Sequence, residues 1–136
     1  MKVLFQEIRT RYLSSDANAV ALRDIVNGLY LGKAPSSATH PFITMTVPSG
    51  GATYATGSGG ASIPIVNQRV QFSTWDDTES PTRIIEASEY LKSLFDFYCV
   101  AVTNFGTLQF DRVFESLLED PDEGFQGVLT YDVTST

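Results

Sequence analysis

The stretch from Ser49 to Ser62 restricts what this chain can fold into more than any other part of the sequence. It holds five glycines among small Ala, Ser and Thr residues, and Tyr54 is its only large side chain. A segment with so little apolar surface adds almost nothing to a hydrophobic core. Strand-forming residues flank it, at 42–47 and at 63–75. We therefore expect a mobile loop, or the tip of an extended hairpin, that could become ordered on binding.

Two short helices are predicted before the first strand. Residues 3–13 place apolar side chains at four-residue spacing, and residues 17–27 again carry apolar side chains on one face after a polar break. Asp16 can accept hydrogen bonds as the N-cap of the second helix, and Gly28 can end that helix.

A longer helix is predicted over residues 81–98. Ser80 suits the N-cap position and Pro81 suits the first helical position. The apolar side chains step by three and four residues, which gives the helix one buried face. The residues of this face are Ile84, Ala87, Leu91, Leu94 and Tyr98.

Five strands complete the expected fold, at residues 29–34, 42–47, 63–75, 109–118 and 125–134. The acidic turn at 119–124 joins the last two strands as a hairpin. The order is therefore α-α-β-β-β-α-β-β. It indicates a single α+β domain over residues 1–136, with helices packed on one face of a largely antiparallel sheet.

The charge of the chain excludes some functions. The formal net charge is −7, whereas nucleic-acid affinity comes mainly from Lys and Arg on phosphates, so a simple nucleic-acid binder is not expected. Residues 1–75 hold six of the nine basic residues and residues 76–136 hold thirteen of the sixteen acids. This division either creates two surfaces of opposite sign, which favours head-to-tail contact between copies, or disappears when the chain folds. The longest apolar run, Phe97–Val102, is too short to cross a membrane, and the N-terminus does not resemble a signal peptide.

No set of residues in the sequence assembles an active site. His40 lies in a loop between prolines and has no nucleophile motif beside it, so a surface or hinge position is the simpler interpretation. Cys99 is expected to pack in the core, next to Tyr98. The glycines at 57–60 are not followed by the Lys-Ser or Lys-Thr of a phosphate-binding loop.

Two acidic groups, at 76–79 and 119–123, could in principle hold a hard cation such as calcium. Neither matches the spacing of a calcium loop, and the first group precedes a helix, where the helix dipole stabilises negative charge. We therefore expect no metal and no cofactor. Small size, one glycine-rich segment and a polarised charge favour an interaction or assembly protein over an enzyme.

Three strings resemble the tail-completion (tail terminator) proteins of long-tailed bacteriophages. They are LYLGKAP at 29–35 after the two helices, HPFI at 40–43, and QRVQFSTW at 68–75 before an Ala- and Leu-containing helix. The resemblance covers nearly the whole chain, including the closing pair of strands. The segment 49–62 departs from it by being longer and richer in glycine.

The resemblance implies a structural role in the virion without catalysis. Such proteins assemble in the host cytoplasm into a ring, usually of six copies, that caps the head-proximal end of the tail tube. The ring contacts the tail tube protein and the head-completion or neck proteins, and DNA passes through it without specific binding. No membrane is involved.

Two sets of residues are candidates for these contacts. Acidic walls would not grip DNA phosphates, so acidic side chains are expected to face the channel or the rim of a ring, unless they serve solubility alone. These acidic residues are Asp76, Asp77, Asp120, Asp122 and Glu123. The candidate partner-docking residues are Gly50, Gly51, Tyr54, Gly57, Gly59 and Gly60.

Two alternatives stay open at this point. A head-closure or neck connector of the same virion would have the same composition and the same lack of catalytic motifs. A small hydrolase would have to use His40 or the acidic groups.

Overall fold

The fold is described from a computed structural model, which covers residues 2–56, 62–102, 106–120 and 124–135. Three helices and six strands follow one another along the chain, in the order α-α-β-β-β-α-β-β-β. They are α1 (Lys2–Tyr12), α2 (Ala17–Ile25), β1 (Leu29–Leu31), β2 (Phe42–Thr56), β3 (Ser62–Asp76), α3 (Thr82–Phe95), β4 (Cys99–Val102), β5 (Gly106–Asp120) and β6 (Gly124–Ser135). The predicted α+β class and order of elements are confirmed, with the short strand β4 added.

The strands form one sheet in the order β1-β2-β3-β6-β5-β4. Every neighbouring pair is antiparallel except β1 and β2, which run parallel. β3 and β6 occupy the centre, and their register runs from Asn67↔Thr134 to Asp76↔Phe125. β3 and β6 are far apart in the sequence, so the centre of the sheet forms only when the last strand pairs with a strand from the middle of the chain.

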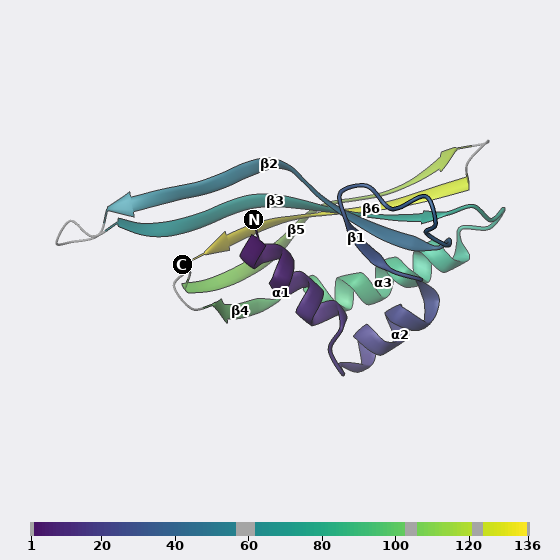
Figure 1. Cartoon of the computed structure of the whole chain (residues 1–136), viewed down its shortest axis with the longest axis horizontal. Coiled ribbons are helices and arrows are strands. Elements are labelled where there is room, and N and C mark those ends of the chain that lie inside the picture. The colour runs from purple at the N-terminus through teal and green to yellow at the C-terminus, as the bar shows by residue number, and fades with distance from the viewer. Residues whose placement is uncertain (1, 57–61, 103–105, 121–123, 136) are drawn as a thin grey trace.

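The helices cover one face of the sheet (Figure 1). Strand residues on that face are buried, including Ile43 and Met45 of β2 and Val70 and Phe72 of β3. An aromatic cluster fills the centre of this layer, with ring centroids 5.1 Å apart for Phe72 and Phe95, 5.5 Å for Phe95 and Phe110, and 6.3 Å for Phe110 and Tyr131. These contacts make the helix-facing side of the central strands the hydrophobic core.

The two N-terminal helices form largely as their sequence predicts. The Asp16 carboxylate accepts a hydrogen bond from the Asn18 backbone N–H at 2.9 Å and caps α2. α2 ends at Ile25, three residues before Gly28, because Val26 adopts an extended conformation. Gly28 is therefore not the end of the helix; its carbonyl accepts a hydrogen bond from the Ile43 N–H.

The third helix is shorter than predicted at both ends. It begins at Thr82 with Pro81 in the cap position, and it ends at Phe95. Phe97 has a left-handed φ of 59°, which a helix cannot contain, and the chain turns there into β4. Cys99 therefore lies at the start of an outer strand and is exposed, which corrects the expectation that it packs in the core.

Candidate interaction surfaces

The β2–β3 hairpin extends beyond the rest of the sheet. Pairing between β3 and β6 stops at Asn67↔Thr134, but pairing between β2 and β3 continues to Thr56↔Ser62. We call residues 49–56 and 62–66 the arm; it forms one end of the molecule (Figure 1). Its backbone follows the hairpin alternative of the sequence analysis as far as Thr56.

Three of the predicted docking residues, Gly50, Gly51 and Tyr54, lie in the β2 strand of the arm. They pair with Gln68, Asn67 and Pro64 of β3. The other three, Gly57, Gly59 and Gly60, lie outside the described residues. Docking and mobility of the segment stay predictions.

The outer edge of β2 is covered only at its beginning. β1 pairs with residues 43–45, and the Gly32 N–H donates to the Met45 carbonyl at 2.8 Å. Beyond this point no strand in the described part of the chain pairs with that edge. Its backbone groups are thus available to a further strand.

A second open edge lies on the opposite margin of the sheet, along β5. β4 pairs with residues 106–109, and the Phe110 N–H donates to the Tyr98 carbonyl at 2.9 Å. From residue 111 to 119, which we call the β5 edge, no described strand lies on the side of β5 away from β6. Four large apolar side chains of this stretch are about half exposed: Val113, Phe114, Leu117 and Leu118. An open strand with exposed apolar side chains is a typical site of strand addition.

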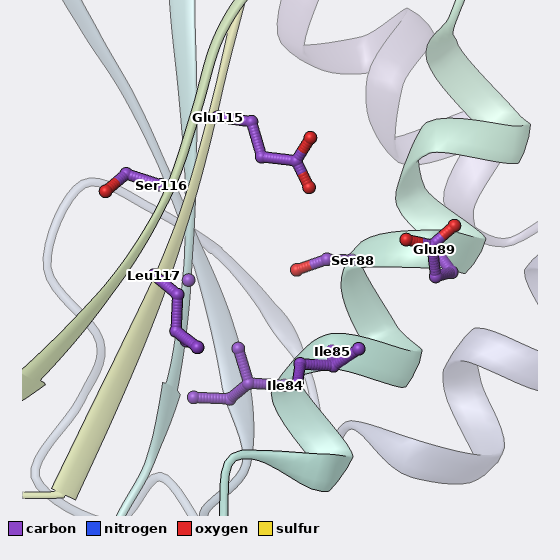
Figure 2. A pocket seen from close by; sticks show the side chains of 8 residues that line it. Ile84, Ile85, Ser88, Glu89, Glu115, Ser116 and Leu117 are labelled. Carbon is purple, nitrogen blue, oxygen red and sulfur yellow. The ribbon is translucent and has the colours of Figure 1, made fainter.

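A β-bulge decides which side chains the β5 edge presents on each face. The register shifts between Arg112 and Phe114, where an extra residue enters β5. Before the bulge, Leu108 and Phe110 are buried under the helices. After it, Glu115 and Leu117 lie on the helix side, whereas Ser116 points away from α3 (Figure 2).

A groove separates the β5 edge from the first half of α3. It has a volume of about 310 Å³ and is lined mainly by Ile84, Ile85, Ser88, Glu89, Glu115 and Leu117. Figure 2 shows Leu117 and Ile84 pointing toward each other across it. Gly127 of β6 lines the groove as well, and a Cβ there would lie only 2.6 Å from Cγ2 of Ile84. Glycine therefore allows α3 to approach the sheet at this point.

Charged side chains close the far end of the groove. Lys92 Nζ lies 2.6 Å from Glu89 and 3.0 Å from Glu115, and both hydrogen bonds raise the pKa of Lys92. Arg112 also binds Glu115, at 2.7 Å. The neighbouring Tyr131 hydroxyl donates a hydrogen bond to Asp96 at 2.6 Å, and burial raises the pKa of Tyr131. The groove is thus apolar in its middle and polar at this end.

Asp76 does not belong with the surface acids. Its side chain is fully buried, and Arg83 of α3 binds both carboxylate oxygens, at 3.0 and 2.7 Å. The Thr78 hydroxyl donates a further hydrogen bond to it at 3.0 Å. Asp76 therefore ties the end of β3 to the start of α3, and the expected position on a channel or rim is corrected for this residue.

Two of the other predicted acids, Asp77 and Asp120, lie at one end of the molecule. Asp77 and Asp120 are both exposed. Gly124, which pairs with Asp120, lies so close to the 76–77 backbone that a Cβ would be 2.8 Å from Cα of Asp77. Asp122 and Glu123 lie outside the described residues. The end that carries Asp77 and Asp120 is opposite the arm (Figure 1).

The contacts of His40 are those of a residue that holds its loop in place. Its Nδ1 is 3.5 Å from a carboxylate oxygen of Asp77, and its ring packs against Phe42 with centroids 4.9 Å apart. Asp77 can orient an imidazole, but Phe42 supplies no group that reacts. Within the described residues, no three His, Cys, Asp or Glu side chains come together as a metal site requires. No helix in that part of the chain is long and apolar enough to span a membrane.

The β5 edge and its groove were not among the sequence-predicted sites. The pattern of residues 113–118 did contain a signal, because apolar residues occur as adjacent pairs at 113–114 and 117–118. A strand with one buried face alternates apolar and polar side chains, and adjacent pairs break that alternation. Whether the strand lies at an edge depends on its neighbours, which local sequence does not reveal.

Comparisons with known proteins show likeness at the level of the fold. No protein-family model and no curated protein matches the sequence. Among solved structures, a chain of the virion of a native gene transfer agent particle matches with a TM-score of 0.61 and 9% identity, over 93% of this chain and 90% of that chain. The gp17 protein of bacteriophage SPP1 matches with a TM-score of 0.55 and 18% identity, over 96% of this chain and 88% of that one. The chain thus shares the fold of two proteins from phages or phage-like particles.

Proposed function

We propose that this protein is a structural component of a phage virion that assembles into a ring at the head-proximal end of the tail. In this role it caps the tail tube and joins it to the head-completion or neck proteins. The likeness of the whole fold to a gene transfer agent virion chain and to SPP1 gp17 supports this proposal. We therefore propose assembly, and not catalysis, as the function of this chain.

The shape of the molecule supports ring formation. The arm and the β5 edge lie at opposite ends of the molecule (Figure 1). Subunits that contact each other through different surfaces at opposite ends form closed rings or open filaments. We propose the closed form, with six copies by analogy with the tail terminator family.

The acidic end suits a passage for DNA. Asp77 and Asp120 are exposed there, and Asp122 and Glu123 follow Asp120 in the sequence. A ring of six copies would carry six times the −7 formal charge of one chain, and such walls repel phosphates. We propose that the exposed carboxylates of this end face the channel or the rim.

The proposal is tested by mixing the purified protein with tail tube protein. Native mass spectrometry or light scattering should detect a ring, alone or on the tube. A strict monomer at every concentration, both with and without tube protein, would contradict it. Pull-down with portal-side protein in place of tube protein distinguishes a head-closure connector from a tail terminator, and a hydrolytic activity abolished by His40→Ala would favour an enzyme.

A further inference from the structure

We propose that the β5 edge of one copy receives the arm of the next copy, so that the outer strand of the arm, β2, extends the sheet from subunit to subunit. This inference rests on the proposed ring and names the contact that builds it. The contact is strand addition: backbone hydrogen bonds form along the β5 edge, and alternate side chains of the incoming strand reach the groove beside α3.

The β5 edge has the features that strand addition requires. Its backbone from 111 to 119 has no strand neighbour among the described residues on the side away from β6. The groove beside it has an apolar wall formed by Ile84, Ile85 and Leu117. Phe114 and Leu118, both about half exposed, would be covered when a strand is added.

The charges along the β5 edge favour the arm as the strand that is added there. The β5 edge carries three acids, Asp111, Glu115 and Glu119, and one arginine, Arg112. Residues 41–68, which include the whole arm, contain no acidic and no basic residue. An uncharged strand approaches the acidic edge without repulsion. Pairing of two β5 edges would instead place like charges opposite each other, which is unfavourable.

The position of the arm and the backbone of its two strands also favour β2 as the added strand. Because the arm and the β5 edge lie at opposite ends of the molecule, one copy cannot fill its own edge (Figure 1). The β2 and β5 edges also lie on opposite margins of the sheet, so joining them continues the sheet in one direction. Within the arm, Pro64 removes a backbone donor from β3, which leaves β2 as the better edge.

Two complementary variants test the contact. The first lacks residues 52–66, so that Gly51 and Asn67 form a two-residue turn between the paired Gly50 and Gln68; it keeps the β5 edge and loses the arm. The second carries Leu117→Lys, which puts a charge at the edge and keeps the arm. Each variant alone should stay monomeric under conditions in which the unmodified chain assembles. Mixed, they should form a one-to-one complex and nothing larger.

Three controls keep the result decisive. Leu13→Lys changes an equally exposed leucine away from the edge and should assemble as the unmodified chain does. Ala52→Glu in the full-length arm should reproduce the loss seen on deletion, because it brings a carboxylate to the acidic edge. Circular dichroism establishes that each variant is folded.

The inference is overturned if the two variants do not combine at about 1 mM, measured by shifts of the β5 amide signals in an isotope-labelled arm-deleted chain. It is also overturned if the arm-deleted chain assembles by itself. The mixture measures one contact and needs no ring. Its failure beside intact rings of the unmodified chain rejects this contact alone, whereas failure of the unmodified chain to assemble on tube protein rejects the proposed function.

Discussion

The centre of the sheet and its two extensions differ in what surrounds each strand. In the centre, β3 and β6 have strand neighbours on both sides and helices over one face, and their inward side chains are almost fully buried. In the arm and along the β5 edge, one side of a strand has no neighbour among the described residues. The comparison separates the part of the sheet that is enclosed by strands and helices from the parts that leave backbone groups or apolar surface uncovered.

The largest effect is expected from the core that the helices cover, of which the centre of the sheet forms the floor. Phe110→Ala removes a fully buried ring that contacts Phe95 and Tyr131, and it should lower the free energy of unfolding by about 3–5 kcal/mol. Urea titration followed by circular dichroism measures this change. Phe97→Ala is the matched control, because that ring is 83% exposed, and it should change the free energy by less than about 0.5 kcal/mol. Equal effects would remove the distinction between core and surface.

The buried carboxylate at the edge of the centre should have the next largest effect. Asp76→Ala leaves Arg83 and Thr78 without their shared acceptor, and it should cost about 2 kcal/mol of stability. Asp77→Ala, one residue further along and exposed, should cost less than about 0.5 kcal/mol. The same urea titration measures both. A larger effect at Asp77 would argue against Asp76 as the link between β3 and α3.

A pH-dependent effect is expected at Tyr131, where the core meets the charged end of the groove. Tyr131→Phe loses the hydrogen bond to Asp96 and should cost about 1 kcal/mol at neutral pH. Burial raises the pKa of Tyr131 in the folded state, so its contribution is complete below the unfolded pKa of about 10 and declines as the pH rises above that value. The stability difference between the two proteins should therefore narrow above about pH 10. A constant difference would show that Tyr131 titrates alike in both states.

The smallest effect on stability is expected from the arm. Removal of residues 52–66 takes away the part of the β2–β3 hairpin that extends beyond its pairing with β6, so the melting temperature should move by only a few degrees, which corresponds to about 1 kcal/mol or less. Differential scanning calorimetry measures the shift. The same variant should lose assembly. A large fall in melting temperature would show that the arm contributes to stability as the centre of the sheet does.

Local patterns predicted most of the centre. The helical stripe of Ile84, Ala87, Leu91 and Leu94 is buried as its spacing indicates, and in β6 Leu129, Tyr131 and Val133 share one buried face. Both patterns depend only on the period of an element that packs on a core. The sequence does not indicate the end of α3, because that end depends on the backbone torsions of two residues, an extended Asp96 followed by Phe97 with a positive φ, and no local pattern announces them.

The interaction surfaces were predictable only in part. The absence of bulky side chains predicts that residues 49–62 add little to the core, and the structure shows residues 49–56 as a strand paired with β3. Asp76 was grouped with the exposed acids because sequence shows its charge and not its partner, Arg83. Local sequence does not indicate the β5 edge, because an edge is defined by the absence of a neighbouring strand, and here that depends on β4 beginning only at Cys99, which pairs with Gln109.

The bulge between Arg112 and Phe114 also bears on how this surface can change during evolution. Arg112 lies opposite Tyr131 and Phe114 lies opposite Thr130, so the loss of the extra residue, Val113, would leave every following residue opposite its present partner and on its present face. The loss of a residue elsewhere in β5 would instead turn the side chains on one side of the deletion to the opposite face. A single-codon deletion therefore disturbs this strand least at the bulge, where it would straighten the β5 edge and keep Phe114 and Leu118 on the face that they occupy now.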